Sequence, residues 1–202
     1  MSSSERDIKM KILLAAKRLF AKQGFDGTSV RQICEEAGAN VALVSYHFGG
    51  KDNMFTALFQ TFFPGADLSK YEPFLQDPVK GVLKLVEEVT RLRLNDPELF
   101  LVIQHEILKN TPRVAVIQQY IFPVWFRVRE LLARGRDEGV FRFRSLDNTL
   151  FFVLGTLLFY KNIEYFSPLL TEPASGFDEM YRDTAVFLLQ GLGVPGKAED
   201  YL

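Results

Sequence analysis

Apolar residues recur at helical spacing along the whole chain, so the pattern predicts helices joined by turns. The first helix is predicted over 5–23, with an apolar stripe along one side. Ser29 and Gln32 have the spacing of a capping box, so a second helix is expected to begin at Ser29 and to end at Gly38, whose backbone tolerates positive φ. The predicted buried face of this helix contains Val30, Ile33, Cys34 and Ala37.

A third, short helix is predicted over 41–48, with Asn40 as its N-cap and Gly49-Gly50 at its end. Val44 and Phe48 are expected to pack inward. A fourth helix is predicted over 52–63, where Pro64-Gly65 ends it. Two short helices joined by a glycine turn are typical of a DNA-reading helix-turn-helix, but a helical hairpin in any all-α protein would carry the same caps.

The pattern beyond residue 65 is also helical. Three pairs place an N-cap residue before a proline at the first helical position, which predicts three helix starts: Asp77-Pro78, Asp96-Pro97 and Thr111-Pro112. Pro123 is expected to interrupt the helix that follows, and Gly139 to cap its end. Two long helices are predicted over 147–166 and 177–192. No strand-period run or internal repeat stands out, so the predicted fold class is all-α.

The run Thr149 to Tyr160 is strongly apolar. At about 1.5 Å per residue it covers only ~18 Å of a hydrocarbon core of ~30 Å, so a membrane span is not expected. The run is interpreted as a helix buried on nearly all sides.

The sequence resembles the TetR family of bacterial transcriptional regulators over roughly its first 55 residues. The matching residues are Gly24-Phe25, Thr28-Ser29, Ala37-Gly38-Ala39, Tyr46-His47-Phe48 and Lys51. Asn40-Val41-Ala42 and Tyr46-His47-Phe48-Gly49 fit the subgroup with Asn-Val-Ala at the start and Tyr-His-Phe-Gly at the end of the recognition helix. Ser45 and Val41 depart from the family, because many members have a tyrosine and a basic residue there.

The resemblance implies a helix-turn-helix DNA-binding domain over 1–51 and a helical domain for effector binding and dimerisation over 52–202, with 52–63 as a linker helix. It further implies a homodimer formed through the last two long helices. A repressor released from a palindromic double-stranded operator by a small, largely apolar or aromatic ligand is the expected function. The alternatives are an activator, a regulator without a small-molecule ligand, and a helical protein-interaction module.

The predicted DNA contacts lie on the second and third helices and around them: Thr28, Ser29, Arg31, Asn40, Val41, Ala42, Leu43, Ser45, Tyr46, His47 and Lys51. Because no arginine or lysine lies between Gly38 and Phe48, base reading is expected from apolar contacts and from Arg31. The resemblance assigns phosphate contacts to Thr28, Ser29, Tyr46, His47 and Lys51. Plain helix capping is the alternative for Thr28 and Ser29, and packing beside Phe48 is the alternative for His47.

The chain contains 19 phenylalanines, seven tyrosines and one tryptophan, more aromatic surface than a small bundle needs. The resemblance places several of them along a ligand cavity, and ordinary core packing is the alternative for each. The predicted ligand-binding residues are Tyr120, Trp125, Phe126, Phe151, Phe152, Phe159 and Tyr160.

Composition narrows the class of protein. A net charge of -1 excludes a globally basic nucleic-acid coat, although residues 1–55 carry two more basic than acidic side chains. The single cysteine, Cys34, and the polar segment Met1 to Arg6 fit a cytoplasmic protein without a signal peptide. With only His47 and His105 as histidines, no catalytic constellation is apparent, and neither an enzyme, a metal site nor a cofactor is expected.

Overall fold

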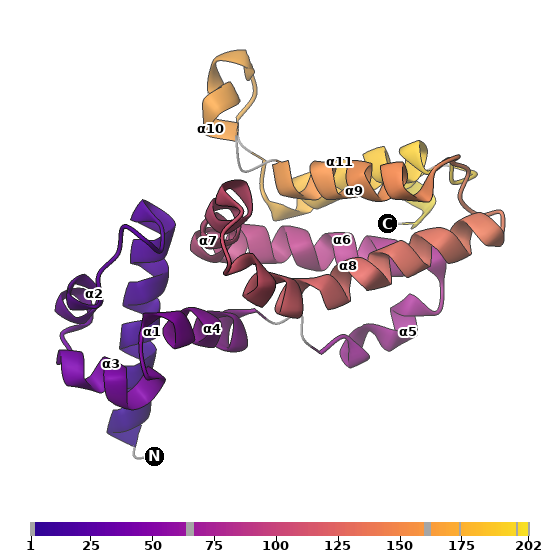
Figure 1. The fold of residues 1–202 in the computed structure, drawn as a ribbon. Coiled ribbons are helices and arrows are strands. Elements are labelled where there is room, and N and C mark those ends of the chain that lie inside the picture. The colour runs from indigo at the N-terminus through magenta and orange to yellow at the C-terminus, as the bar shows by residue number, and fades with distance from the viewer. Residues whose placement is uncertain (1–2, 64–66, 160–162, 174, 197, 202) are drawn as a thin grey trace. The chain divides into compact units, whose positions relative to one another are not determined.

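The computed structural model describes residues 3–63, 67–159, 163–173, 175–196 and 198–201, and these fold into helices joined by turns and short loops (Figure 1). No strand occurs among these residues, and the predicted all-α class is confirmed. The chain forms two compact units. The N-terminal unit comprises 1–66 and 96–123, and the C-terminal unit comprises 67–95 and 124–202.

The N-terminal unit has an aromatic core. Its helices are α1 (Ser3–Gln23), α2 (Val30–Ala37), α3 (Val41–Phe48), α4 (Lys51–Phe62), α7 (Pro97–Lys109) and the first part of α8 (Val114–Asp137). The rings of Phe20 and Phe25 lie 5.1 Å apart, and the Phe55 ring lies 5.5 Å from Phe25 and 5.2 Å from Phe59. Because all four rings are buried, they fasten α1, α4 and the loop before α2 into one body.

A largely buried ion pair joins α7 to α1. Lys17 is buried although it is charged, and its Nζ lies 2.7 Å from Asp96 and 4.4 Å from the centre of the Phe62 ring. The other carboxylate oxygen of Asp96 caps α7 by accepting from the Leu99 N–H at 3.1 Å. One carboxylate therefore both starts α7 and holds it against α1.

The C-terminal unit is a helical bundle. Its elements are a 3-10 turn at Ser69–Tyr71, α5 (Glu72–Leu75), α6 (Pro78–Asn95), the rest of α8, α9 (Leu146–Phe159), α10 (Ile163–Phe166), a 3-10 turn at Ser167–Leu169, α11 (Phe177–Gly191) and a 3-10 turn at Ala198–Tyr201. The guanidinium of buried Arg93 ties three of its helices together, because it donates to the Leu157 carbonyl at 2.9 Å and contacts the Met180 sulfur.

Close packing fixes the end of α8. An added Cβ at Gly135 would lie 2.2 Å from the Phe141 ring, so only glycine allows this buried ring to rest on the helix. The predicted cap at Gly139 is confirmed, since its φ is +74° and the Val140 N–H donates to the Gly135 carbonyl.

Charged side chains form a chain of ion pairs along α6. Lys84 lies 2.8 Å from Glu87 and 2.9 Å from Glu88, and Arg91 lies 2.6 Å from Glu87. Partial burial acts to raise the pKa of Glu87, but the hydrogen bonds from Lys84 and Arg91 outweigh it, so the pKa lies below its usual value.

Most predicted helix starts are confirmed, with one exception. Asp77 accepts from the N–H groups of Val79 and Lys80 before α6, and Asp96 accepts from that of Leu99 before α7. Thr111 does not start a helix at Pro112, because its hydroxyl donates to Glu106 and its N–H closes the end of α7; α8 begins at Val114 instead.

One expectation for the later helices was wrong. Pro123 does not interrupt a helix, since it lies inside α8, at the point where the chain passes between the two units. The predicted helix over 147–166 covers α9 and α10, and residues 160–162, between them in the chain, lie outside the described residues.

The helix α9 is not buried on all sides. Phe151, Phe152 and Phe159 are 70%, 71% and 59% exposed, whereas Val153 and Leu157 are buried. An apolar sequence gives no clue to this, because the exposed face is as apolar as the buried one. Among the described residues, no helix is long and apolar enough to cross a membrane.

Candidate DNA-binding surface

Local hydrogen bonds define both ends of the helix-turn-helix. The Ser29 hydroxyl accepts from the Gln32 N–H at 3.2 Å, and the Gln32 side chain accepts from the Ser29 N–H at 2.8 Å, which completes the predicted capping box. Gly38 ends α2 with a φ of +63°, and Asn40 starts α3 by accepting from the Ala42 N–H at 2.9 Å. The turn between the two helices is therefore fixed by the sequence itself.

The outer face of α3 is free of packing contacts with the core. Val44 and Phe48 are buried, as predicted, and anchor the helix. Tyr46 is 73% exposed and Val41 48% exposed. The rest of this face is formed by three further exposed residues, Asn40, Ala42 and Ser45, with half-buried Leu43 at its edge. A short helix that presents such a face has the form needed to enter a major groove.

Arg31 on α2 is the long cation beside this face. Its side chain is 84% exposed, and it pairs with Glu35 at 3.1 Å. An exposed pair of this kind contributes little, about 0.3–0.5 kcal/mol. Arg31 can therefore exchange Glu35 for another acceptor at small cost.

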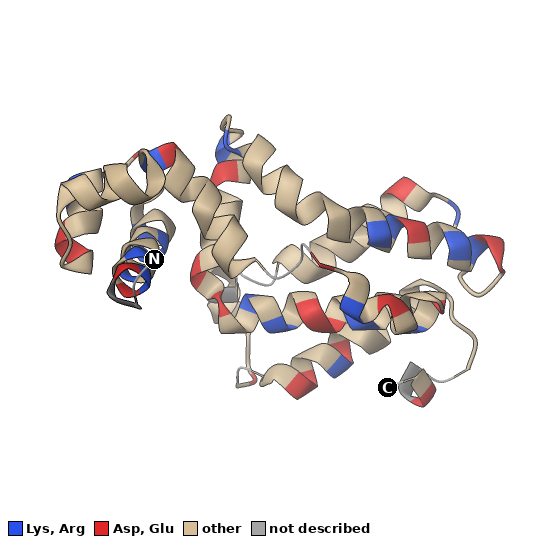
Figure 2. Cartoon of the chain, turned by 90° about the horizontal axis from the view of Figure 1, so that it is seen from below, with Lys and Arg blue, Asp and Glu red and all other residues tan. Residues whose placement is uncertain are grey.

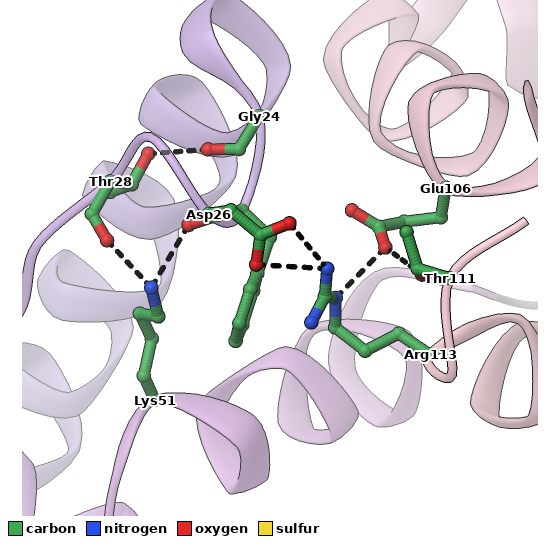
Figure 3. Close-up of polar contacts among 8 residues, drawn as sticks. Gly24, Asp26, Thr28, Lys51, Glu106, Thr111 and Arg113 are labelled. Carbon is green, nitrogen blue, oxygen red and sulfur yellow. Dashed lines mark hydrogen bonds and ion pairs between the residues drawn. The ribbon is translucent and has the colours of Figure 1, made fainter. Parts of the chain in front are cut away.

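Two residues predicted to contact phosphate, Thr28 and Lys51, use their polar groups for hydrogen bonds within the protein (Figure 3). Thr28 is only 1% exposed, and its hydroxyl donates to the Gly24 carbonyl at 2.7 Å. The Lys51 ammonium donates to the carbonyls of Phe25 and Thr28 at 3.0 and 2.8 Å and lies 4.2 Å from the centre of the Phe25 ring. Both side chains hold the loop between α1 and α2 in place.

Ser29 and His47 each make contacts within the protein but are not fully buried. The Ser29 side chain is exposed although it caps α2, so capping leaves it accessible. His47 is half-buried, with its ring 4.9 Å from Tyr46 and 6.2 Å from Phe48. Its Nε2 is buried and has no hydrogen-bond partner in the described part of the chain.

Charge does not single out this surface. Figure 2 shows acidic and basic residues interspersed along the helices in that view. Affinity for a polyanion must then come from particular side chains and helix ends, as the small charge surplus of residues 1–55 predicts. The one cysteine adds no chemistry, because burial and the charge of Glu35 raise the pKa of the Cys34 thiol.

The predicted ligand residues belong to both units and differ in burial. Phe126, Phe151, Phe152 and Phe159 are all more than half exposed in the single chain, and Tyr160 lies outside the described residues. Half-buried Tyr120 belongs to the N-terminal unit, where it stacks on Phe59 at 6.0 Å. Trp125, also half-buried, belongs to the C-terminal unit. The described residues contain no group of three or more histidine, cysteine or acidic side chains placed to hold a metal ion.

Sequence reasoning missed Asp26 and Arg113. The Arg113 Nη2 donates to both carboxylate oxygens of Asp26 at 3.1 Å, and its Nε donates to Glu106 at 2.8 Å (Figure 3). Asp26 immediately follows Phe25 in the loop before α2. No periodicity or motif links two residues 87 positions apart, so no sequence signal was available.

Comparison with known proteins gives consistent matches. Residues 12–58 match the family model described as bacterial regulatory proteins, tetR family. The chain is 30% identical over 142 residues to the HTH-type transcriptional repressor AcnR of Corynebacterium glutamicum, a match that covers 66% of this chain and 69% of AcnR. It is 30% identical over 125 residues to the probable HTH-type transcriptional regulator YttP of Bacillus subtilis, where the match covers 56% of this chain and 60% of YttP.

Solved structures agree. The hemolysin II transcriptional regulator HlyIIR superposes with a TM-score of 0.69 at 27% identity, over 89% of this chain and 97% of HlyIIR. The ketosteroid transcriptional regulator KstR2 of Mycobacterium tuberculosis superposes with a TM-score of 0.72 at 20% identity, over 91% of this chain and 94% of KstR2, and shows the fold alone.

Proposed function

This chain belongs to the tetR family of bacterial regulatory proteins and is a DNA-binding transcriptional regulator, and we propose that it acts as a homodimeric repressor that a small ligand releases from a palindromic operator. The observation that supports DNA binding is the capped helix α3. Val44 and Phe48 anchor it in the core, and its outer face is exposed. A helix held in this way is rigid enough to read bases.

Base reading is proposed to rest on shape and apolar contacts. No guanidinium or ammonium projects from α3, so the bidentate contact with guanine has to come from elsewhere. Val41 and Ala42 are exposed and suit thymine methyl groups. Arg31 supplies the single long cation, and it should recognise one base position.

Phosphate contacts are proposed for Ser29, Tyr46 and His47. The exposed Ser29 side chain lies at the N-terminus of α2, and a helix N-terminus is a favourable place for an anion. We assign Thr28 and Lys51 to the support of this site instead, since the hydroxyl of one and the ammonium of the other are bonded to loop carbonyls. Lys51 then makes no phosphate contact, and Val41 stands where many family members have a basic residue. Each subunit therefore has few side chains that can bind phosphate, so dimerisation is needed for affinity.

The dimer is proposed to form through α9 and α11, which lie next to each other in the C-terminal unit (Figure 1). Their exposed phenylalanines are Phe151, Phe152, Phe159 and Phe187. Burying the exposed part of each ring is worth roughly 1–2 kcal/mol, on the scale of about 1.5–3 for a whole side chain. Eight such rings across a two-fold axis yield an amount comparable to the association cost of about 4–15 kcal/mol.

The effector is proposed to be a small apolar or aromatic molecule that binds in the C-terminal unit near Trp125. Phe151, Phe152 and Phe159 are better assigned to the dimer face than to a closed cavity, which leaves half-buried Trp125 as the aromatic candidate there. In the unliganded dimer the N-terminal units grip the operator. Because α4 buries Met54, Phe55, Leu58 and Phe59, it moves with α1 to α3 as one body when the ligand binds.

Selection of duplexes from a random DNA pool tests DNA reading. The enriched sequences should be palindromes with half-sites about one helical turn apart, ~34–36 Å. Sedimentation should show a dimer, and Phe152→Glu should convert it to a monomer that binds the selected duplex weakly. Leu108→Glu, at an exposed apolar position of α7, is the matched control and should stay dimeric. A monomeric wild type that selects no sequence would refute the proposal.

Trp125 allows the ligand to be tested directly, because it is the only tryptophan in the chain. A panel of small aromatic compounds should contain members that quench its fluorescence saturably and weaken operator binding over the same concentration range. Trp125→Phe should remove the signal while the compound still releases DNA. A compound that quenches without any change in operator affinity would separate ligand binding from regulation and contradict the release mechanism.

A further inference from the structure

The loop between α1 and α2 is held by two cations from distant parts of the chain. Phe25 and Asp26 lie in this loop, residues 24–28, which is followed by the N-cap Ser29 of α2. The Phe25 ring is 6% exposed, and it has the Lys51 ammonium 4.2 Å and the Arg113 guanidinium carbon 3.9 Å from its centre. Lys51 also binds the loop carbonyls, and Arg113 binds the Asp26 carboxylate (Figure 3).

Arg113 is itself fixed from behind. Glu106 on α7 is 2% exposed and accepts from the Arg113 Nε at 2.8 Å, and the Thr111 hydroxyl donates to the same oxygen of Glu106. A guanidinium bonded through its Nε to one carboxylate and through an Nη to another has little rotational freedom. Arg113 therefore transmits the position of its backbone to Asp26.

The backbone of Arg113 lies at the start of α8, the helix that continues into the C-terminal unit. It immediately precedes Val114, the first residue of α8, and α8 passes into the C-terminal unit after Pro123. The loop that Arg113 grips leads directly to Ser29, whose hydroxyl and N–H groups begin α2. A displacement of the first turn of α8 would thus reach the N-terminus of the helix that carries Arg31.

We propose that Arg113 is a positioning residue for DNA reading, which holds the loop 24–28 through Asp26 and Phe25 so that α2 and α3 stand in the binding position. This inference rests on the proposed function, because operator binding is its readout. The ligand signal then has a second route into the N-terminal unit, through the start of α8, in addition to α4.

A substitution of Asp26 distinguishes an effect on the position of the loop from an effect on the stability of the fold. Its side chain is 66% exposed, so its ion pair with Arg113 contributes little to folding. Asp26→Asn should leave thermal stability nearly unchanged. The variant also removes a negative charge from a DNA-binding unit, which by simple electrostatics would strengthen DNA binding. A weaker operator complex would therefore have the sign opposite to the charge effect.

The test measures operator affinity of Asp26→Asn, Arg113→Lys and the double variant on a duplex selected with the wild-type protein. We expect each single variant to bind roughly 5–20-fold more weakly, within the usual range of coupling between sites, and the double variant to bind no more weakly than Arg113→Lys. Glu72→Gln is the matched control. Arg127 in the C-terminal unit, like Arg113, pairs with two carboxylates, and this variant removes the exposed carboxylate of Glu72 from it.

Amide hydrogen exchange provides a readout that does not depend on DNA. The N–H groups of Thr28 and Gln32 should exchange faster in Asp26→Asn than in the wild type and in Glu72→Gln. Unchanged operator affinity in both single variants, with a wild type that binds, would overturn the inference and leave the proposed function standing. If the wild type selects no duplex, the proposed function fails, and unchanged exchange in the loop would then overturn the positioning role as well.

Discussion

Lys51→Met should destabilise the N-terminal unit without removing a phosphate contact. Lys51 is the first residue of α4, and its ammonium donates to the Phe25 carbonyl at 3.0 Å and to the Thr28 carbonyl at 2.8 Å. It also lies 4.2 Å from the centre of the Phe25 ring. Methionine keeps most of the aliphatic stem, so the variant removes mainly these three interactions.

The size of the effect follows from these contacts. A hydrogen bond with a charged partner contributes about 1.5–3 kcal/mol, and a cation over an aromatic ring about 0.5–2 kcal/mol. Lys51 is only half-buried, which places the total near the sum of the lower limits, so we expect a loss of about 3–4 kcal/mol. For a chain of this length each kcal/mol shifts the Tm by roughly 2–4 °C, so the Tm should fall by about 6–16 °C.

Two measurements decide between support and phosphate contact. Thermal unfolding gives the Tm, and operator titrations at several salt concentrations give the slope of log K against log salt. A lysine that neutralises a phosphate contributes about 0.9 to that slope, whereas we expect Lys51→Met to leave the slope unchanged. Lys80→Met, at an exposed position of α6, is the control for loss of charge alone. An unchanged Tm together with a slope reduced by about 0.9 would refute this reasoning.

Three further predictions concern other parts of the chain. Arg31→Ala should cost about 1–3 kcal/mol of discrimination at one base position, seen by titrating single-base variants of the operator, and leave the Tm unchanged because Arg31 is exposed; equal loss on all variants would mean a phosphate contact. Gly135→Ala should destabilise by about 1–3 kcal/mol in urea unfolding, because its Cβ would overlap the Phe141 ring; an unchanged midpoint would contradict the packing. The lowered pKa of Glu87 means that its contribution is complete above its ordinary value of 4.5 and is lost as pH falls through the folded pKa, so Lys84→Met should flatten the acid limb of a stability–pH curve, and a curve parallel to that of the wild type would argue against this ion pair.

Helix ends could be predicted because their chemistry is local. The bonds that start α2 and α3 join residues two or three positions apart, and a glycine with positive φ ends each of them. The same holds for Asp77 and Asp96 before α6 and α7. Thr111 had the same sequence signal and failed, because Glu106, five residues earlier, takes its hydroxyl. A cap prediction thus fails where a tertiary acceptor competes for the capping group.

The faces of α9 could not be assigned from the sequence. Phe151, Phe152 and Phe159 are as apolar as Val153 and Leu157, and periodicity reports only that residues are apolar. A face buried against the chain's own core and a face that is exposed in the single chain give the same pattern. Burial in the folded chain separates the two, and it moves three predicted ligand residues to the proposed dimer face.

In the candidate site, too, the sequence does not tell which way an individual side chain faces. Thr28 and Lys51 are among the residues that carry the family motif, and a motif marks residues needed for DNA reading without saying whether they touch DNA. In this chain their polar groups face inward, onto carbonyls of the loop that Arg113 grips through Asp26. We therefore propose that contact is made by Ser29, by Arg31 and by side chains of α3, and that the geometry of this contact depends on the loop. Substitutions in the loop and its supports should therefore weaken operator binding although none of these residues reaches a base.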